Sequence, residues 1–153
     1  MDTIRCVFLG ESGVGKSTIL SKMAKNNYHI TPTIGVDNVL FEYKKIHFQC
    51  WDTSGSTQFG AVVNLFEKRT SHKVYVYDTS RPITFNREKL PHDGIIVANV
   101  RENKPPLVHT HIVVREDDQL SIENLMNIMT TTFETEESTI SVVYDQRECC
   151  TCC

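Results

Sequence analysis

The chain has 153 residues, a length that suits one compact domain, and its 40% hydrophobic and 23% charged residues are ordinary for globular proteins. Its formal net charge of −3 argues against nucleic acid as a partner, because proteins that bind nucleic acid usually present positive charge. No apolar run reaches the roughly 18 residues of a membrane-spanning helix, and the N-terminus lacks a signal-peptide pattern, so we expect a cytosolic protein.

A strand, a loop and a helix are predicted at the start of the chain. Residues 4–9 form a short apolar run that ends in a glycine-rich loop. Residues 16–25 follow and carry Ile19, Leu20 and Met23 at helical spacing.

An antiparallel hairpin is predicted next. Pro32 breaks regular structure, and apolar residues then alternate along 39–43 and again along 46–50. Lys44 and Lys45 lie between the two runs.

The following segments predict an α/β fold with a shortened second half. Residues 61–69 can form a short helix, while 74–77 and 94–98 are apolar runs of the kind found in buried parallel strands. The alternation of strand and helix patterns favours the α/β class. Only about eight residues separate Phe85 from Gly94, fewer than a crossover helix usually needs, so that helix should be almost missing.

The last segments predict one more helix and a tail. Residues 117–129 have the best helical pattern of the second half, behind an aspartate cap. Residues 139–144 have a strand-like pattern, and 145–153 lack any periodicity, which predicts a flexible tail. On this interpretation too few residues remain for a long final helix, and one face of the sheet would be exposed.

A phosphate-binding loop is the strongest motif. The segment GESGVGKS satisfies G-x-x-x-x-G-K-[ST] and lies between a predicted strand and a predicted helix, which is the context that the motif requires. Its glycines let backbone N–H groups surround an anion, Lys16 supplies a cation, and Ser17 offers a hydroxyl to Mg²⁺. The candidate nucleotide-binding residues of this loop are Gly10, Ser12, Gly13, Val14, Gly15, Lys16, Ser17 and Thr18. The motif indicates a nucleoside triphosphate and does not identify the base.

Two further segments narrow the class of protein. WDTSG places Asp52 at the end of an apolar strand, where its carboxylate can hold the Mg²⁺ shell, and Gly55 leaves an N–H near the γ-phosphate. The loop TPTIGVD offers Thr33, whose hydroxyl could complete the Mg²⁺ sphere only while the γ-phosphate is present. Ser17, Thr33 and Asp52 are therefore the candidate metal ligands, and Thr33 is the candidate nucleotide sensor.

In this order and at about these intervals, GESGVGKST, TIGVD and WDTSG closely resemble the first half of Rab-type small GTPases of the Ras superfamily, over roughly residues 4–85. The resemblance implies a P-loop NTPase fold, with a mostly parallel sheet, one antiparallel hairpin, and flanking helices reduced in the C-terminal half. It implies a small GTPase domain at 1–144 and a cysteine-rich tail at 145–153.

The resemblance also implies ligands and partners. GTP or GDP would bind with Mg²⁺, Lys16 would contact the β- and γ-phosphates, and Asp52 would order the metal through water. The loops around Thr33 and Gly55 would be the two switches that meet effectors, an exchange factor and a GTPase-activating protein.

Several positions depart from the family pattern. The glutamine that normally follows the D-x-x-G glycine is replaced by Ser56, whose short side chain cannot orient the attacking water, so hydrolysis should be slow. The candidate catalytic residues are then Lys16, Thr33 and Ser56, whereas Gln58 is expected to be an exposed loop residue. Tyr28 lies where the family keeps an aromatic residue near the base, although its ring could equally close over the phosphates or lie on the surface.

The base-reading motifs are altered. The guanine-reading N-K-x-D motif occurs as NVRE, which keeps Asn99, loses the lysine and lengthens the aspartate to Glu102. A carboxylate is still the right chemistry for the adjacent N–H donors of guanine, so Glu102 could read the base or could be a solvated loop charge. The S-A-K loop of the family would fall near 133–138 and is effectively absent.

The chain ends in CCTCC, and its terminal pair, Cys152 and Cys153, resembles the Rab ending that the prenylation machinery modifies with two lipids. Two lipids give stable anchoring, so the resemblance implies a protein held on the cytosolic face of a membrane. Palmitoylation, metal capture and no modification are the alternatives.

The leading hypothesis is a Mg²⁺-dependent GTP-binding switch of the Rab type with slow hydrolysis, acting in membrane traffic or its subversion. The alternative is a pseudo-GTPase that binds nucleotide without turnover and serves as a decoy or scaffold. A P-loop kinase or another NTPase would explain the phosphate-binding loop but not the TIGVD and WDTSG segments.

Overall fold

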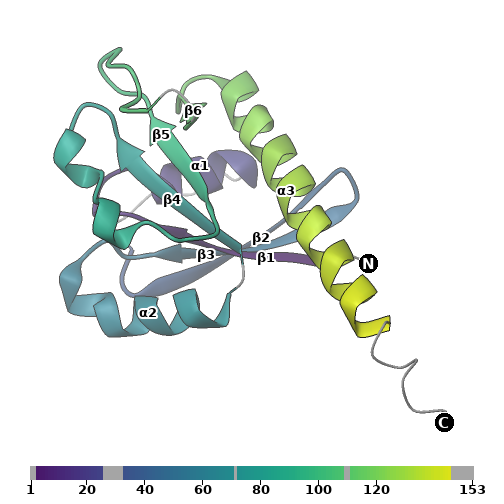
Figure 1. Cartoon of the computed structure of the whole chain (residues 1–153). Coiled ribbons are helices and arrows are strands. Elements are labelled where there is room, and N and C mark those ends of the chain that lie inside the picture. The colour runs from purple at the N-terminus through teal and green to yellow at the C-terminus, as the bar shows by residue number, and fades with distance from the viewer. Residues whose placement is uncertain (1–2, 26–32, 71, 109–110, 146–153) are drawn as a thin grey trace, which may run out of the picture.

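A six-stranded sheet forms the centre of the computed structural model, which describes residues 3–25, 33–70, 72–108 and 111–145, with side chains to residue 133 (Figure 1). The strands lie in the order β2-β3-β1-β4-β5-β6, and every neighbouring pair is parallel except β2 with β3. In chain order the strands are β1 (Thr3–Leu9), β2 (Val36–Tyr43), β3 (Ile46–Thr53), β4 (His72–Asp78), β5 (Ile95–Asn99) and β6 (Ile112–Val114). The mostly parallel sheet with one antiparallel hairpin is confirmed.

Helices cover both faces of this sheet. α1 (Lys16–Met23) and α3 (Gln119–Asp145) lie on one face, and α2 (Gly60–Arg69) lies on the other (Figure 1). The short 3₁₀ helices are η1 (Thr57–Phe59), η2 (Pro82–Thr84) and η3 (Arg87–Lys89). Only η2 and η3 lie between β4 and β5, which confirms the missing crossover helix. In the part of the chain that the structure describes, no helix has the length and apolar character needed to cross a membrane.

The core explains why the strands are apolar at nearly every position. Successive side chains of a strand point to opposite faces, so a sheet covered on both faces needs apolar residues on both. On β1, Cys6 and Phe8 pack in the layer under α1 and α3, whereas Val7 and Leu9 pack in the layer on the α2 side. α3 contributes five buried residues to the first layer at spacings of three and four: Ile122, Leu125, Met126, Met129 and Phe133.

The final helix differs from the sequence prediction. α3 runs without a break from Gln119 to Asp145, so a long final helix does form, and residues 139–144 are helical rather than strand-like. The β-branched residues of 139–144 favour strands only weakly, and extending a helix that is already formed costs less than starting a new strand. Strand β6 was not predicted, because three residues are too few for a recognisable period.

The expectation of an exposed sheet face is also wrong. Tyr75 and Tyr77 of β4 are 1% and 0% exposed on the α2 side. Phe85, which follows η2, packs its ring 4.9 Å from that of Tyr77, and Phe66 of α2 packs 5.7 Å from Trp51. A few aromatic side chains therefore cover the area that a crossover helix would otherwise bury.

The turn of the hairpin is fastened to α3. Lys44 and Lys45 both have positive φ, of 51° and 68°, as a two-residue hairpin turn requires. The Tyr43 hydroxyl and the Lys44 ammonium donate to the same Asn127 Oδ1, at 2.8 and 2.7 Å. The turn end of the hairpin is thus tied to the middle of α3.

Two leucines of α3 provide a test of its packing. Leu125 is fully buried and Leu120 is 74% exposed, so Leu125→Ala should lower the free energy of unfolding by about 2 to 5 kcal/mol through lost burial and a cavity. Leu120→Ala is the matched control and should change it by less than about 0.5 kcal/mol. Urea titration measures both values, and equal effects would show that Leu125 is not packed in the core.

Candidate functional site

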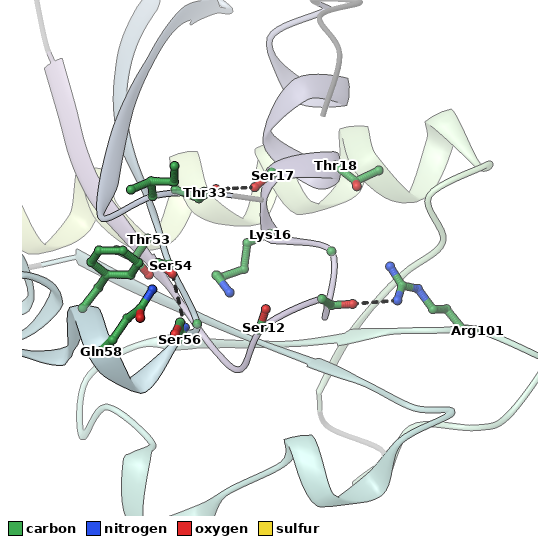
Figure 2. Close-up of a pocket in the computed structure, with 15 residues that line it drawn as sticks. Ser12, Lys16, Ser17, Thr18, Thr33, Thr53, Ser54, Ser56, Gln58 and Arg101 are labelled. Atoms are coloured by element: carbon green, nitrogen blue, oxygen red, sulfur yellow. Dashed lines mark hydrogen bonds between the residues drawn. The ribbon is translucent and has the colours of Figure 1, made fainter. Parts of the chain in front are cut away.

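The candidate site lies where the carboxyl ends of neighbouring parallel strands meet. The loop 10–15 connects β1 to α1 there, and β3 ends beside it at Thr53. Together they line a pocket of about 490 Å³ (Figure 2). Its lining residues are Ser12, Gly13, Gly15, Lys16, Ser17, Thr18, Thr33, Ile34, Thr53, Ser54, Gly55, Ser56, Gln58, Phe59 and Arg101. The structure therefore brings most of the predicted site residues into one cavity.

Lys16 lies at the centre of this pocket (Figure 2). The residue is only 5% exposed, and its ammonium group donates to the carbonyl oxygens of Gly10 and Glu11, both at 2.9 Å. Burial lowers the pKa of Lys16 to about 8, although the negative charges of Asp52 and Glu11 oppose the shift. A buried cation held by neutral carbonyl groups is well prepared to exchange them for an anion.

Three oxygen-bearing side chains from separate segments meet beside Lys16. Thr33 Oγ1 donates to Asp52 Oδ2 at 3.0 Å and lies 3.0 Å from Ser17 Oγ, which also donates to Asp52 Oδ2. Asp52 is 3% exposed, and its Oδ1 has no hydrogen-bond partner among the described residues. Burial raises the pKa of Asp52, while hydrogen bonds from Ser17 and Thr33 and the charge of Lys16 oppose the shift.

This cluster fits Mg²⁺. Two hydroxyls and a carboxylate are hard oxygen donors of the type that Mg²⁺ prefers. A buried carboxylate oxygen without a partner is costly unless a cation or a donor satisfies it. The predicted metal ligands Ser17, Thr33 and Asp52 are thus placed together.

The loop after β3 lies directly against the phosphate-binding loop. A Cβ atom on Gly55 would collide with the backbone nitrogen of Ser12, so only glycine permits this approach. The N–H of Ser56 donates to Ser54 Oγ at 3.2 Å, and η1 begins after Ser56. Ser56 and Gln58 both face the pocket at the end opposite Arg101 (Figure 2).

Asn99 lies on the other side of the phosphate-binding loop. The residue is fully buried at the end of β5, and its Nδ2 donates to the carbonyl oxygen of Val14 at 2.8 Å. Glu102 does not join it, since its side chain is 69% exposed and pairs with Lys104 at 3.3 Å. Of the two predicted base-side residues, the structure therefore brings only Asn99 to the site.

The position predicted for the S-A-K loop is wrong. Residues 133–138 lie inside α3, and the loop that follows the last strand is at 115–118 instead.

Charged residues that were not among the predicted site residues also surround the loop. Arg81 Nη2 donates to the carbonyl oxygen of Ser12 at 3.3 Å, and Arg101 Nη1 donates to that of Gly13 at 2.8 Å. Both arginines pair with the buried Asp78, and Arg101 also pairs with Glu116. Asp78 could have been noticed, because it ends an apolar strand run, as Asp52 does.

Some predicted residues lie outside the part of the chain that the structure describes. Tyr28, Cys152 and Cys153 belong to this group, so their roles stay predictions.

The chain is similar to known proteins of one family. A family model described as Ras family matches residues 5–132. The chain is 31% identical to the GTP-binding protein ypt3 of Schizosaccharomyces pombe, over 83% of this chain and 66% of the relative. The chain belongs to the Ras family.

Two Rab-named relatives refine the assignment. The Ras-related protein RabC of Dictyostelium discoideum is 31% identical over 92% of this Ras-family chain and 80% of the relative. The Ras-related protein Rab11A of Nicotiana tabacum is 32% identical over 78% of this chain and 61% of the relative. These names indicate the Rab type of small GTPase, as the motifs predicted, although the chain spans less than two thirds of several relatives.

The lowered pKa of Lys16 predicts a pH dependence of anion binding. As the pH rises through the pKa of about 8, the free protein loses the charge of Lys16, and binding a phosphate chain would restore it by taking up a proton. Nucleotide binding at about pH 8.5 should therefore take up roughly three quarters of a proton at Lys16, and only about a tenth of a proton at about pH 7. Calorimetry in two buffers of different ionisation enthalpy measures this number, and no uptake at the higher pH would contradict the prediction.

Proposed function

We propose that this chain is a GTP-binding switch of the Rab type that acts in membrane traffic or its subversion. The observation that supports it best is the meeting of Ser17, Thr33 and Asp52 beside the buried Lys16. Membership of the Ras family and the GTP-binding protein among its relatives agree with this proposal.

The phosphate chain would bind along the loop 10–15, where backbone N–H groups and the ammonium group of Lys16 neutralise its charge. Ser17, Thr33 and Asp52 would hold Mg²⁺, which withdraws charge from the phosphate oxygens when bound. The prediction that Ser12, Gly13 and Thr18 bind the nucleotide is consistent with their place on the pocket wall.

The switch itself would consist of two loops that meet at the γ-phosphate. Thr33 belongs to the first loop and contacts Asp52, whereas Gly55 belongs to the second and touches the phosphate-binding loop. A bound γ-phosphate and Mg²⁺ would add contacts to both loops, so loss of the γ-phosphate would remove those contacts and loosen both loops. Effectors, an exchange factor and a GTPase-activating protein would recognise these loops.

Hydrolysis is phosphoryl transfer to water: the water oxygen forms a bond to the γ-phosphorus while the bond to the β,γ-bridging oxygen breaks, giving GDP and phosphate. Positioning of that water is the step that the protein must assist. Ser56 lies at the pocket wall with a side chain too short to reach over the γ-phosphate, and we therefore propose slow turnover. Complete loss of turnover would make the chain a pseudo-GTPase that acts as a decoy or scaffold.

The membrane anchor is the part of the proposal that rests on sequence alone. Cys152 and Cys153 would carry two lipids and hold the protein on the cytosolic face of a membrane.

One experiment separates the switch from the alternatives. We expect the purified protein to carry GDP or GTP, identified by chromatography after heat release, and bound GTP to lose its γ-phosphate over hours. A protein that retains GTP without loss is the pseudo-GTPase. A protein that is empty and binds neither GTP nor GDP contradicts the proposal.

A substitution at Ser56 tests the role proposed for its short side chain. Ser56→Gln supplies an amide that can orient water, and it should raise the single-turnover rate of GTP hydrolysis by about tenfold or more. Asn64→Gln, which places the same amide on the exposed side of α2, is the matched control and should leave the rate unchanged. Equal rates for the wild type and Ser56→Gln would show that the short side chain is not what limits turnover.

A further inference from the structure

A carboxylate from the loop after β6 reaches back to the phosphate-binding loop. Glu116 Oε1 accepts hydrogen bonds from Asn99 Nδ2 at 2.7 Å and from Arg101 Nη2 at 2.6 Å. Its side chain is 28% exposed, so it is partly shielded while still open to a ligand. A loop 17 residues beyond Asn99 in the sequence thus supplies an acceptor at the same site.

A chain of charges holds this carboxylate in place. Arg101 donates through Nη2 to Glu116 and through Nη1 to Asp78, at 2.6 and 3.1 Å. Asp78 ends β4 and its side chain is only 2% exposed, so it fixes Arg101 to the rigid sheet. Glu116 therefore lies in a set position although it comes from a loop.

Glu116 also touches the point where α1 begins. A Cβ atom on Gly15 would collide with Glu116 Oε1 and Asn99 Nδ2, so both side chains lie directly against this glycine. Gly15 has a φ of 103°, which itself favours glycine. The carboxylate is thus in contact with the loop that would carry the phosphates.

The position of Glu116 corresponds to the nucleoside end of the pocket. Ser56 and Gln58 mark the end where the γ-phosphate would lie, Arg101 lies at the opposite end, and Lys16 is between them (Figure 2). A base attached to the phosphate chain would therefore emerge beside Arg101 and Glu116. Glu102, by contrast, pairs with Lys104 in solvent.

We propose that Glu116, positioned by Arg101 and Asp78, is the residue that selects guanine, in place of Glu102. Guanine presents two adjacent donors, its ring N1–H and its 2-amino group. Glu116 Oε1 already accepts from Asn99 and Arg101, so the other carboxylate oxygen, Oε2, is the acceptor that would meet these donors. Adenine has no donors at these positions and presents a ring nitrogen acceptor in place of N1–H, so it would give Oε2 no hydrogen bond and would be disfavoured. This inference deepens the proposed function and rests on it.

Inosine diphosphate, which lacks only the 2-amino group, provides the probe. Glu116→Gln replaces one acceptor oxygen by a donor, and it should lower the ratio of GDP affinity to inosine diphosphate affinity by about tenfold, the value of a hydrogen bond to a charged group. Glu102→Gln makes the same chemical change on the exposed neighbour and should leave the ratio unchanged. Displacement of a fluorescent nucleotide from the full chain, with Mg²⁺, measures every affinity.

Two further substitutions of Glu116 distinguish selection of the base from a merely structural role of this residue. Glu116→Asp keeps the carboxylate and should keep most of the ratio, whereas Glu116→Thr is a second variant without a carboxylate and should lose it. Thermal unfolding without nucleotide checks that each variant is folded.

Other results would overturn the inference on Glu116 or the proposed function. An unchanged ratio in Glu116→Gln and Glu116→Thr, or a fall in Glu102→Gln, overturns this inference while the proposed function stands. Tighter GDP binding by Glu116→Gln than by the wild type would also overturn it. That result would mean that the carboxylate of Glu116 in the wild type hinders binding of the base. A wild-type chain that binds no GDP overturns the proposed function, and this inference with it.

Discussion

The rest of the site depends on a nearly buried carboxylate, one oxygen of which has no hydrogen-bond partner in the part of the chain that the structure describes. Asp52 must be surrounded by donors or a cation, because a buried charge without partners is costly. Ser17 from α1 and Thr33 from the loop before β2 both donate to it, so three segments are held together at one carboxylate. The parallel pairing of β1 and β3 makes this possible, since it brings the ends of both strands to the same edge.

The phosphate and metal residues could be predicted because their signals are local. The spacing around Lys16 and Ser17 fixes a loop between a strand and a helix, and Asp52 follows directly from the end of an apolar run. The base side could not be predicted in the same way. Arg101 and Glu116 come from different loops and meet Asn99 only after β5 and β6 have paired, so no short pattern contains them.

The fold shows the same division between local and distant signals. The hairpin and the missing crossover helix follow from short runs and from a residue count, and both are confirmed. The long final helix was missed because its last residues have strand propensity, which the preceding helix overrides. The covered second face was missed as well, because Phe85 and Tyr77 come together only through the tertiary fold.

The link between the hairpin turn and α3 has a mechanical consequence. Tyr43 and Lys44 tie one end of β2 to Asn127, while the other end of the strand begins at Val36, three residues after Thr33. A strand pinned at its far end cannot slide along its neighbour without breaking two hydrogen bonds. Thr33 therefore lies close to the free end of a strand whose other end is anchored, and the hairpin can serve as a fixed frame for the Thr33 contacts.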